Sequence, residues 1–159
     1  MKARILHLTL TLIVVLAFPV AGDELVPFRA AIDTEPIIVG ACGPACLELE
    51  IGGEGVATYL GRTEIQAPSQ VDLLHGLQTG TSTLTAANGD TIVIAIEGTA
   101  QFSGPAPTDP VTFQGAWVVI GGTGRFEDAT GSGTYSGSAA GTVGQFTLEG
   151  NISRPDAKR

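Results

Sequence analysis

The first residues to suggest a chemistry are glycines, because glycines after an apolar strand can hold the phosphates of a nucleotide. Residues 117–133 read WVVIGGTGRFEDATGSG, with Gly121-Gly122-Thr123-Gly124 directly after an apolar run. In a dinucleotide site such glycines open a helix whose N-terminus binds the pyrophosphate. Here Glu127 stands where the third glycine would fall, and four more glycines follow within residues 131–141. Glycine costs about 1 kcal/mol per helix position relative to alanine, so we expect no long helix and no nucleotide cofactor.

We interpret this motif as a structural turn between two strands. Glycine adopts positive φ angles without a steric penalty, so Gly121, Gly122 and Gly124 are expected to form the corner. Phe126 is expected to fold back onto the end of the sheet.

The two cysteines, Cys42 and Cys46, are separated by Gly-Pro-Ala. Redox motifs of the thioredoxin type have one residue fewer between the cysteines and lie beside a βαβ pattern, which is missing here. A zinc site needs more ligands, and His75 is the remaining histidine once residues 1–22 are removed. We therefore predict a structural disulfide across the turn and no metal site. Free or catalytic thiols are the alternative.

Other catalytic combinations find little support in the sequence. His75 is the available base for a hydrolytic triad, and no serine lies in a G-x-S-x-G elbow. Glu48 and Glu50 alternate on one strand face, which favours a solvent-exposed pair. Glu127 and Asp128 follow the glycine turn, where Asp128 is suited to cap a single helical turn.

Five polar or aromatic residues are candidates for reaching a ligand cavity, although their spacing does not tell which strand faces lie inside. Arg125 could pair with the acids that follow it or with an anionic ligand. These candidate ligand-binding residues are Tyr59, Arg62, Glu97, Arg125 and Tyr135.

Hydrophobic residues alternate with polar ones along most of the chain, a period typical of half-buried strands. Asn88-Gly89, between two β-rich runs, is the strongest short hairpin signal and predicts a two-residue turn. Residues 69–77 are ambiguous and could form a short helical turn. The pattern predicts an all-β domain of about eight strands in simple succession. We expect an antiparallel up-and-down barrel, since closure removes exposed strand edges. A two-sheet sandwich is the alternative.

Residues 1–22 have the pattern of a secretory signal peptide: Lys2 and Arg4, an apolar stretch over 5–18, and small residues before Asp23. An uncleaved anchor is the alternative, but the stretch is short for a span of about 20 residues. We expect a secreted or periplasmic protein whose single barrel domain covers residues 23–159, with a core at about 45–153.

The chain is acidic, which limits its partners. Its net charge of −8 falls to −10 when the signal peptide removes two cations and no acid. Such a chain is repelled by phosphate backbones, so we expect no nucleic-acid partner. Solubility outside the cytoplasm explains the charge equally well.

Three pieces of the sequence carry a family resemblance: GEGVATYLGRTEI, TLTAANGDTI and VVIGGTGRFEDATGSGTYSG, in this order. They resemble the allene oxide cyclase-like and dirigent-like barrels, most closely their small exported bacterial members, over roughly Leu47 to Ile152. The resemblance implies a calycin-like barrel of eight strands, often trimeric, with an apolar ligand cavity. The acidic and arginine pocket residues of that family do not fall in the matching pieces, so no catalytic residue is carried over.

Two functions follow as hypotheses. In the first, the protein is a noncatalytic exported barrel that binds a small apolar molecule or serves in the cell envelope. In the second, it is a cyclase or isomerase of the allene oxide cyclase or dirigent type, which works by shaping its substrate.

Overall fold

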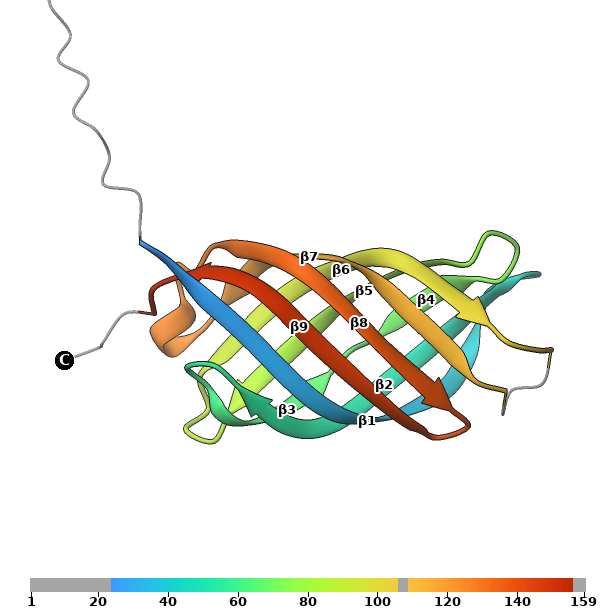
Figure 1. The fold of residues 1–159 in the computed structure, drawn as a ribbon, viewed down its shortest axis with the longest axis horizontal. Helices are drawn as coiled ribbons and strands as arrows, with labels where there is room; N and C mark the ends of the chain where they lie inside the picture. The colour runs from blue at the N-terminus through green and yellow to red at the C-terminus, as the bar shows by residue number, and fades with distance from the viewer. Residues whose placement is uncertain (1–23, 106–108, 156–159) are drawn as a thin grey trace, which may run out of the picture.

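The computed structural model describes residues 24–105 and 109–155, which form one closed antiparallel β-sheet (Figure 1). The predicted signal peptide lies outside the described residues. The strands are β1 (Leu25–Gly43), β2 (Cys46–Ala57), β3 (Gly61–Gln66), β4 (Ser69–Asp72), β5 (Leu77–Ala86), β6 (Thr91–Phe102), β7 (Val111–Gly122), β8 (Gly131–Ala140) and β9 (Val143–Ser153).

The nine strands close in a ring of eight. The order is β1-β9-β8-β7-β6-β5-β3-β2-β4, and β1–β2 and β5–β4 pairings complete it. β3 and β4 share one place in the ring, because both pair with β2 on one side and β5 on the other. Ala67-Pro68 separates them, and proline interrupts a ladder since it has no N–H to donate. The predicted antiparallel barrel is confirmed, and the sandwich alternative is not adopted.

The core begins earlier than the expected residue 45. β1 is 19 residues long and pairs with both β2 and β9, so it closes the barrel. Its inward side chains include Val26, Phe28 and Ile32, all buried. The prolines at 27 and 36 obscure the strand pattern in the sequence, because proline is rare in strand interiors.

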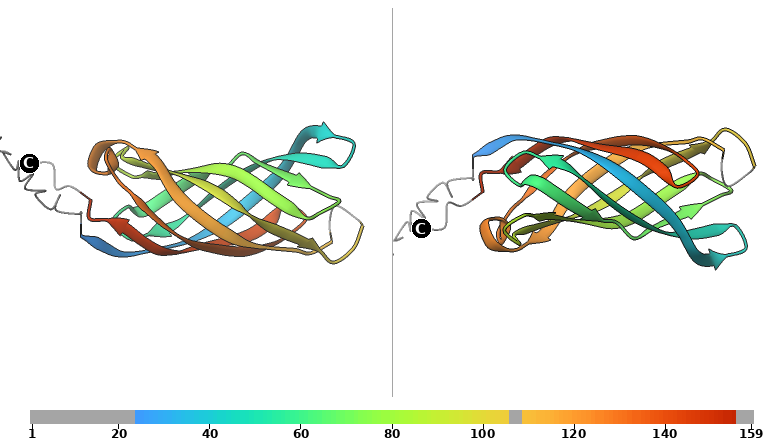
Figure 2. Two further views of the ribbon diagram at one scale, coloured as in Figure 1. Left: turned by 90° about the horizontal axis from the view of Figure 1, so that it is seen from above. Right: turned by 90° about the horizontal axis from the view of Figure 1, so that it is seen from below.

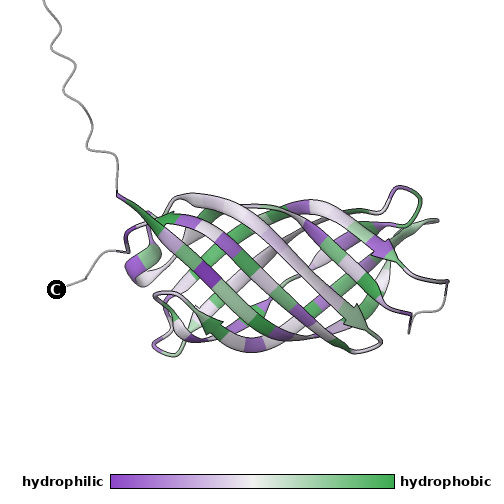
Figure 3. Ribbon diagram, viewed as in Figure 1, coloured by the Kyte–Doolittle hydropathy of each residue, from purple (hydrophilic) through white to green (hydrophobic). Residues whose placement is uncertain are grey.

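Alternation along each strand separates the inner from the outer face, and hydrophobic and hydrophilic residues follow one another along the ribbon (Figure 3). On β6, Ile92, Ile94 and Ile96 are buried while Glu97 is exposed. The inner faces of β8 and β9 are less uniform, because both strands place several glycines inward. Large rings from other strands occupy that space.

Trp117 is the clearest case of a ring that lies over glycines. Along one level of the sheet, Trp117 of β7 is followed by Gly133 of β8, Gly150 of β9 and Phe28 of β1. A Cβ at either glycine would come within 2.6–2.7 Å of the indole. The indole meets the Phe28 ring edge to face at 5.8 Å, and its N–H donates to the Thr134 carbonyl at 2.9 Å. These contacts fix the packing at this level of the barrel.

The two ends of the barrel differ (Figure 2). The 3₁₀ helix η1 (Gly124–Phe126) and both ends of the described chain lie at one end, which we call the η1 end. Its interior is filled with buried side chains, including Phe28, Leu84, Ile92, Trp117, Phe126, Leu148 and Ile152. The β1–β2 hairpin with the disulfide lies at the other end, which we call the disulfide end.

The glycine motif forms a corner at the η1 end. Gly121 and Gly122 are the last residues of β7 and do not have positive φ angles. Of the three glycines predicted to form the corner, Gly124 alone has a positive φ, of +63°, and the helix that follows has three residues. Phe126 is fully buried in the core cluster. The Arg125 guanidinium pairs with Asp90 Oδ2 at 2.7 Å, which ties the corner to the β5–β6 hairpin.

One turn differs from its predicted form, and the structure resolves the ambiguity of residues 69–77. The Asn88-Gly89 hairpin joins β5 to β6, but its loop has three residues instead of two: Ala86 and Asp90 form the closing pair, and Gly89 has a φ of +87°. This matches a type I turn with a glycine bulge. Residues 69–77 comprise β4 and a turn at 73–76, where Asp72 accepts the backbone N–H groups of Leu74 and His75.

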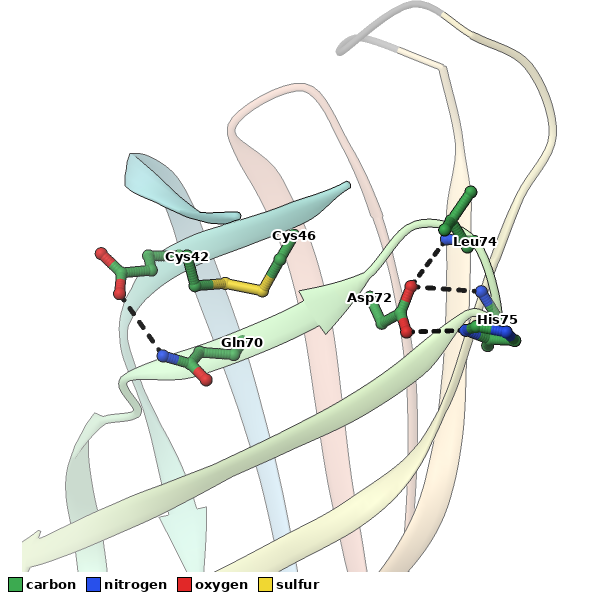
Figure 4. The surroundings of a disulfide bond; sticks show 7 residues. Cys42, Cys46, Gln70, Asp72, Leu74 and His75 are labelled. Atoms are coloured by element: carbon green, nitrogen blue, oxygen red, sulfur yellow. Dashed lines mark hydrogen bonds and ion pairs between the residues drawn. A yellow bond between two sulfur atoms is a disulfide. The ribbon is translucent and has the colours of Figure 1, made fainter. Parts of the chain in front are cut away.

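Cys42 and Cys46 are joined by a disulfide, as the spacing predicts (Figure 4). The Cα atoms are 5.1 Å apart across a tight turn in which Gly43 pairs with Cys46. Cys46 is also aligned with Asp72 of β4. The bond therefore lies beside the 73–76 turn, at the rim of the barrel.

Candidate ligand-binding cavity

The disulfide end of the barrel contains a cavity of about 530 Å³. This volume lies within the range of small-molecule sites, about 300–1,000 Å³. The inner wall is formed by apolar side chains from eight of the nine strands, including Ile51, Ile65, Ile96, Phe113 and Phe146. Large rings fill the η1 end instead, so the barrel is packed at one end and hollow at the other.

The rim of the cavity is apolar as well. Ile38, Leu73 and Phe102 line it, and they are 51%, 44% and 45% exposed. They come from β1, the turn after β4 and the end of β6, three segments that meet at the disulfide end. A molecule that enters here meets hydrophobic surface first.

Polar side chains are few in the lining: Thr34, Gln78, Ser82 and Asp109. Asp109, in the loop between β6 and β7, is the one charged residue among the lining residues described. No lysine, arginine or histidine lines the cavity within the described part of the chain. Arg29, Arg62, Arg125 and Arg154 form ion pairs with carboxylates elsewhere.

Gln78 is held in place by Tyr135. The two residues lie at one level of the sheet, with Gly115 of β7 and Gly98 of β6 between them. The phenol crosses both glycines and donates to Gln78 Oε1 at 3.2 Å. If these glycines carried a Cβ atom, it would lie 2.5 Å from a Tyr135 atom at position 98 and 2.7 Å from one at position 115. The glycines therefore provide the space that the Tyr135 ring occupies.

Burial changes the acidity of this phenol. Desolvation, with a smaller contribution from the charge of Glu97, raises the pKa of Tyr135 to about 12. The ring also packs against Phe113 and Phe146, with centroids at 6.5 Å and 5.7 Å. Tyr135 is thus a neutral hydrogen-bond donor at physiological pH, and its two aromatic neighbours line the cavity.

Ser82 of β5 is fully buried and lines the cavity. Within residues 24–105 and 109–155, its Oγ is the one buried side-chain polar atom that has no hydrogen-bond partner. Buried polar groups in folded proteins are nearly always paired, and leaving one unpaired costs about 1–3 kcal/mol. This hydroxyl therefore marks a point in the cavity where a hydrogen bond remains to be made.

The five residues predicted as ligand-binding candidates are not brought together. Tyr59 is 41% exposed in the β2–β3 turn, with a φ of +66°. Arg62 pairs with Glu54 at 2.8 Å on the outer surface. Glu97 is exposed on β6, and Arg125 lies at the η1 end. Tyr135 faces inward and reaches the cavity through Gln78. Ligand binding by these residues stays a prediction.

Sequence reasoning did not single out Gln78 and Ser82. Both lie on the inner face of β5, in LQTGTSTLTA. The buried residues of this strand are Gln78, Ser82, Leu84 and Ala86, and the residues between them are more exposed. The period of two is visible in the sequence of β5. Gln78 and Ser82 are polar like the outward residues of an ordinary strand, so the pattern does not reveal that their side chains face inward.

His75 and Asp72 form a pair at the rim of the barrel. His75 Nδ1 lies 2.7 Å from Asp72 Oδ2 at the rim, and hydrogen bonding to His75 lowers the pKa of Asp72. Among residues 24–105 and 109–155, no three His, Cys, Asp or Glu side chains gather to hold a metal ion. The described part of the chain also lacks a helix long and apolar enough to cross a membrane.

Comparisons with protein-family models, curated proteins and solved structures found no match to this chain.

Proposed function

We propose that this protein is an exported, noncatalytic β-barrel that binds a small, largely apolar molecule in the cavity at its disulfide end. The observation that carries the proposal is the cavity of about 530 Å³, lined mainly by apolar side chains and bordered by an apolar rim. Burial of apolar surface contributes roughly 25 cal/mol per Å², so a hydrophobic ligand gains affinity from every wall.

Export rests on the signal-peptide pattern of residues 1–22. The disulfide is consistent with it, because disulfides persist in oxidising compartments. An apolar cavity in an eight-membered barrel ring is also what the resemblance to allene oxide cyclase-like barrels implies. A trimer, which the same resemblance implies, belongs to the proposal as a homo-oligomer to be tested by light scattering.

A cyclase or isomerase that shapes its substrate is the second candidate. The observation that favours it is a buried ionisable group next to the cavity, since perturbed pKa values cluster at functional sites. That group is Tyr135, whose pKa is raised to about 12. A catalytic acid or base works best with a pKa near the operating pH, and this phenol is already bonded to Gln78. Tyr135 is therefore poorly suited to act as a catalytic acid or base, and we favour ligand binding over catalysis.

The test is binding of the apolar fluorophore N-phenylnaphthylamine to the mature protein. The wild type should bind it with enhanced fluorescence. Ala139→Trp, which fills the cavity from β8, should weaken binding about tenfold or more. The matched control is Ser138→Trp, because Ser138 is the exposed neighbour on the same strand. Absence of binding to the wild type, or equal binding by a folded Ala139→Trp variant, would refute the proposal.

A further inference from the structure

The polar atoms of the cavity indicate what kind of apolar molecule it accepts. We infer that the ligand is an uncharged amphiphile, with one hydroxyl or carbonyl group that bonds to Ser82 and an apolar chain that extends to the rim. This inference rests on the proposed function and specifies the ligand class for the same site.

The first support is the position of Ser82. Its hydroxyl can donate one hydrogen bond and accept two, yet no side chain or backbone group among residues 24–105 and 109–155 is its partner. It faces the cavity while being fully buried. A hydroxyl or carbonyl group on the ligand would supply the missing hydrogen bond to the Ser82 hydroxyl.

Gln78, the other polar residue on this strand, is less suited to bind the head group. Its Oε1 already accepts the Tyr135 phenol. It lies four positions from Ser82 along the strand, about 13 Å at roughly 3.3 Å per residue. One small polar group cannot contact both.

The second support is the charge of the site. A carboxylate head group would meet no cation in the lining, because none of the described lining residues is basic. Burying an unpaired charge is costly, and the net charge of −8 repels anions at a distance. An ammonium head group would find Asp109 at the rim and no second acid among the described lining residues. A neutral head group avoids both costs.

The third support is the orientation that the walls impose. The exposed lining residues Ile38, Leu73 and Phe102 are all apolar and lie at the opening. The hydroxyl of Ser82 lies on the enclosed wall of β5, with Ile94 of β6 opposite. The polar group of the ligand therefore points inward and its chain outward.

The experiment compares four molecules of equal chain length as competitors of bound N-phenylnaphthylamine: octanol, chlorooctane, octanoate and octylamine at neutral pH. Octanol should bind most tightly. Octanoate and octylamine should bind about tenfold more weakly or worse, because each carries a charge into the cavity.

Two variants separate the head-group contact from the chain contact. Ser82→Ala should weaken octanol binding about three- to tenfold, the equivalent of one neutral hydrogen bond, and leave chlorooctane binding unchanged. Leu73→Ser should weaken both competitors about threefold or more, since it removes apolar surface at the rim. Leu74→Ser is its matched control, because Leu74 is 77% exposed and does not line the cavity.

The outcomes separate the two proposals. If N-phenylnaphthylamine fails to bind the wild type, the proposed function fails. If the fluorophore binds but Ser82→Ala leaves the affinity for octanol unchanged, as it does for chlorooctane, the inference is overturned. The Ser82 hydroxyl would then bond to an internal water and not to the ligand. Tighter binding of octanoate or octylamine than of octanol would overturn it as well.

Discussion

The phenol of Tyr135 reaches Gln78 across two intervening strands, and the hydrogen bond between them is 3.2 Å long. This contact is possible because β6 and β7 carry glycine at the same level, at positions 98 and 115. The ring replaces the side chains that those strands lack. It therefore joins β8 to β5 through the interior and forms part of the support of the cavity.

Adding a methyl group under this ring should destabilise the barrel. In Gly98→Ala the new Cβ would collide with the backbone carbonyl oxygen of Gln114 and lie 2.5 Å from the Tyr135 hydroxyl oxygen, so we expect a loss of about 1–3 kcal/mol, the usual cost of overpacking. Gly52→Ala is the control, because nothing lies within 4 Å of its Cβ position; it should be neutral or slightly stabilising. Denaturant unfolding of both variants measures the difference, and equal stabilities would contradict the packing described.

Alkaline pH should destabilise the protein through Tyr135. Its pKa is raised to about 12 in the folded state, against about 10 in an unfolded chain. The stabilisation is complete below pH 10 and is lost as the pH rises toward 12, by roughly 2–3 kcal/mol in all.

The Tyr59→Phe variant leaves Tyr135 as the single tyrosine, so tyrosinate absorbance then reports on this residue alone. Titration near pH 10 in the folded variant would contradict the prediction. In Tyr135→Phe, the alkaline loss of stability should be smaller.

Acid should weaken the contact between the glycine corner and the β5–β6 hairpin. A hydrogen bond from Arg125 holds the pKa of Asp90 below its usual value. The lowered pKa stabilises the fold above about pH 3.9, the unfolded value, and this stabilisation is lost as the pH falls through the folded value. Unfolding from pH 5 down to pH 2 should be less pH-dependent in Asp90→Asn and in Arg125→Met than in the wild type. An unchanged slope in both variants would show that the ion pair is not coupled to stability.

Valine should be tolerated at one position of the glycine corner and not at two others. Gly124 has a φ of +63°, and a Cβ there would collide with Asp90; at Gly122 it would lie 2.9 Å from the Cβ of Phe126. Each valine should cost roughly 1–3 kcal/mol. Gly121→Val is the control, with open space around its Cβ position.

Phe126→Ala tests the packing of the same corner. The ring is fully buried, so its removal should cost about 3–5 kcal/mol. Thermal melts with and without NAD or ATP give the measurement for all four corner variants. Stabilisation of the wild type by a nucleotide, lost only in the valine variants, would restore the nucleotide-site interpretation.

The disulfide should form in the mature protein and stabilise the rim of the cavity. Mass spectrometry of the non-reduced chain should show the loss of two hydrogens. Closing so small a loop contributes about 2 kcal/mol in the loop-entropy model, so the Cys42→Ser/Cys46→Ser variant should melt at a lower temperature. Two thiols that react with iodoacetamide before reduction would contradict the prediction.

Much of the fold was predictable from local signals. The period of two predicted antiparallel strands, the glycine motif predicted a corner, and the cysteine spacing predicted a disulfide. These succeed because strand alternation, turn glycines and short-range bonds depend on neighbours in the sequence. The first strand was missed, since Pro27 and Pro36 interrupt its pattern.

The site itself depended on the tertiary structure. Glycines 98 and 115 have no side chain whose direction a pattern could reveal, and their role appears only when β8 brings Tyr135 over them. The same holds for Gln78 and Ser82: a polar residue inside and a polar residue outside look alike along one strand. Barrel closure decides which face of β5 is enclosed, and packing of large rings decides which end stays hollow. Most of the strands and the places where the chain turns could be read from the sequence, because these follow from local periodicity and turn residues. Only the closed ring, in which residues over a hundred positions apart share one wall, determined where a ligand can bind.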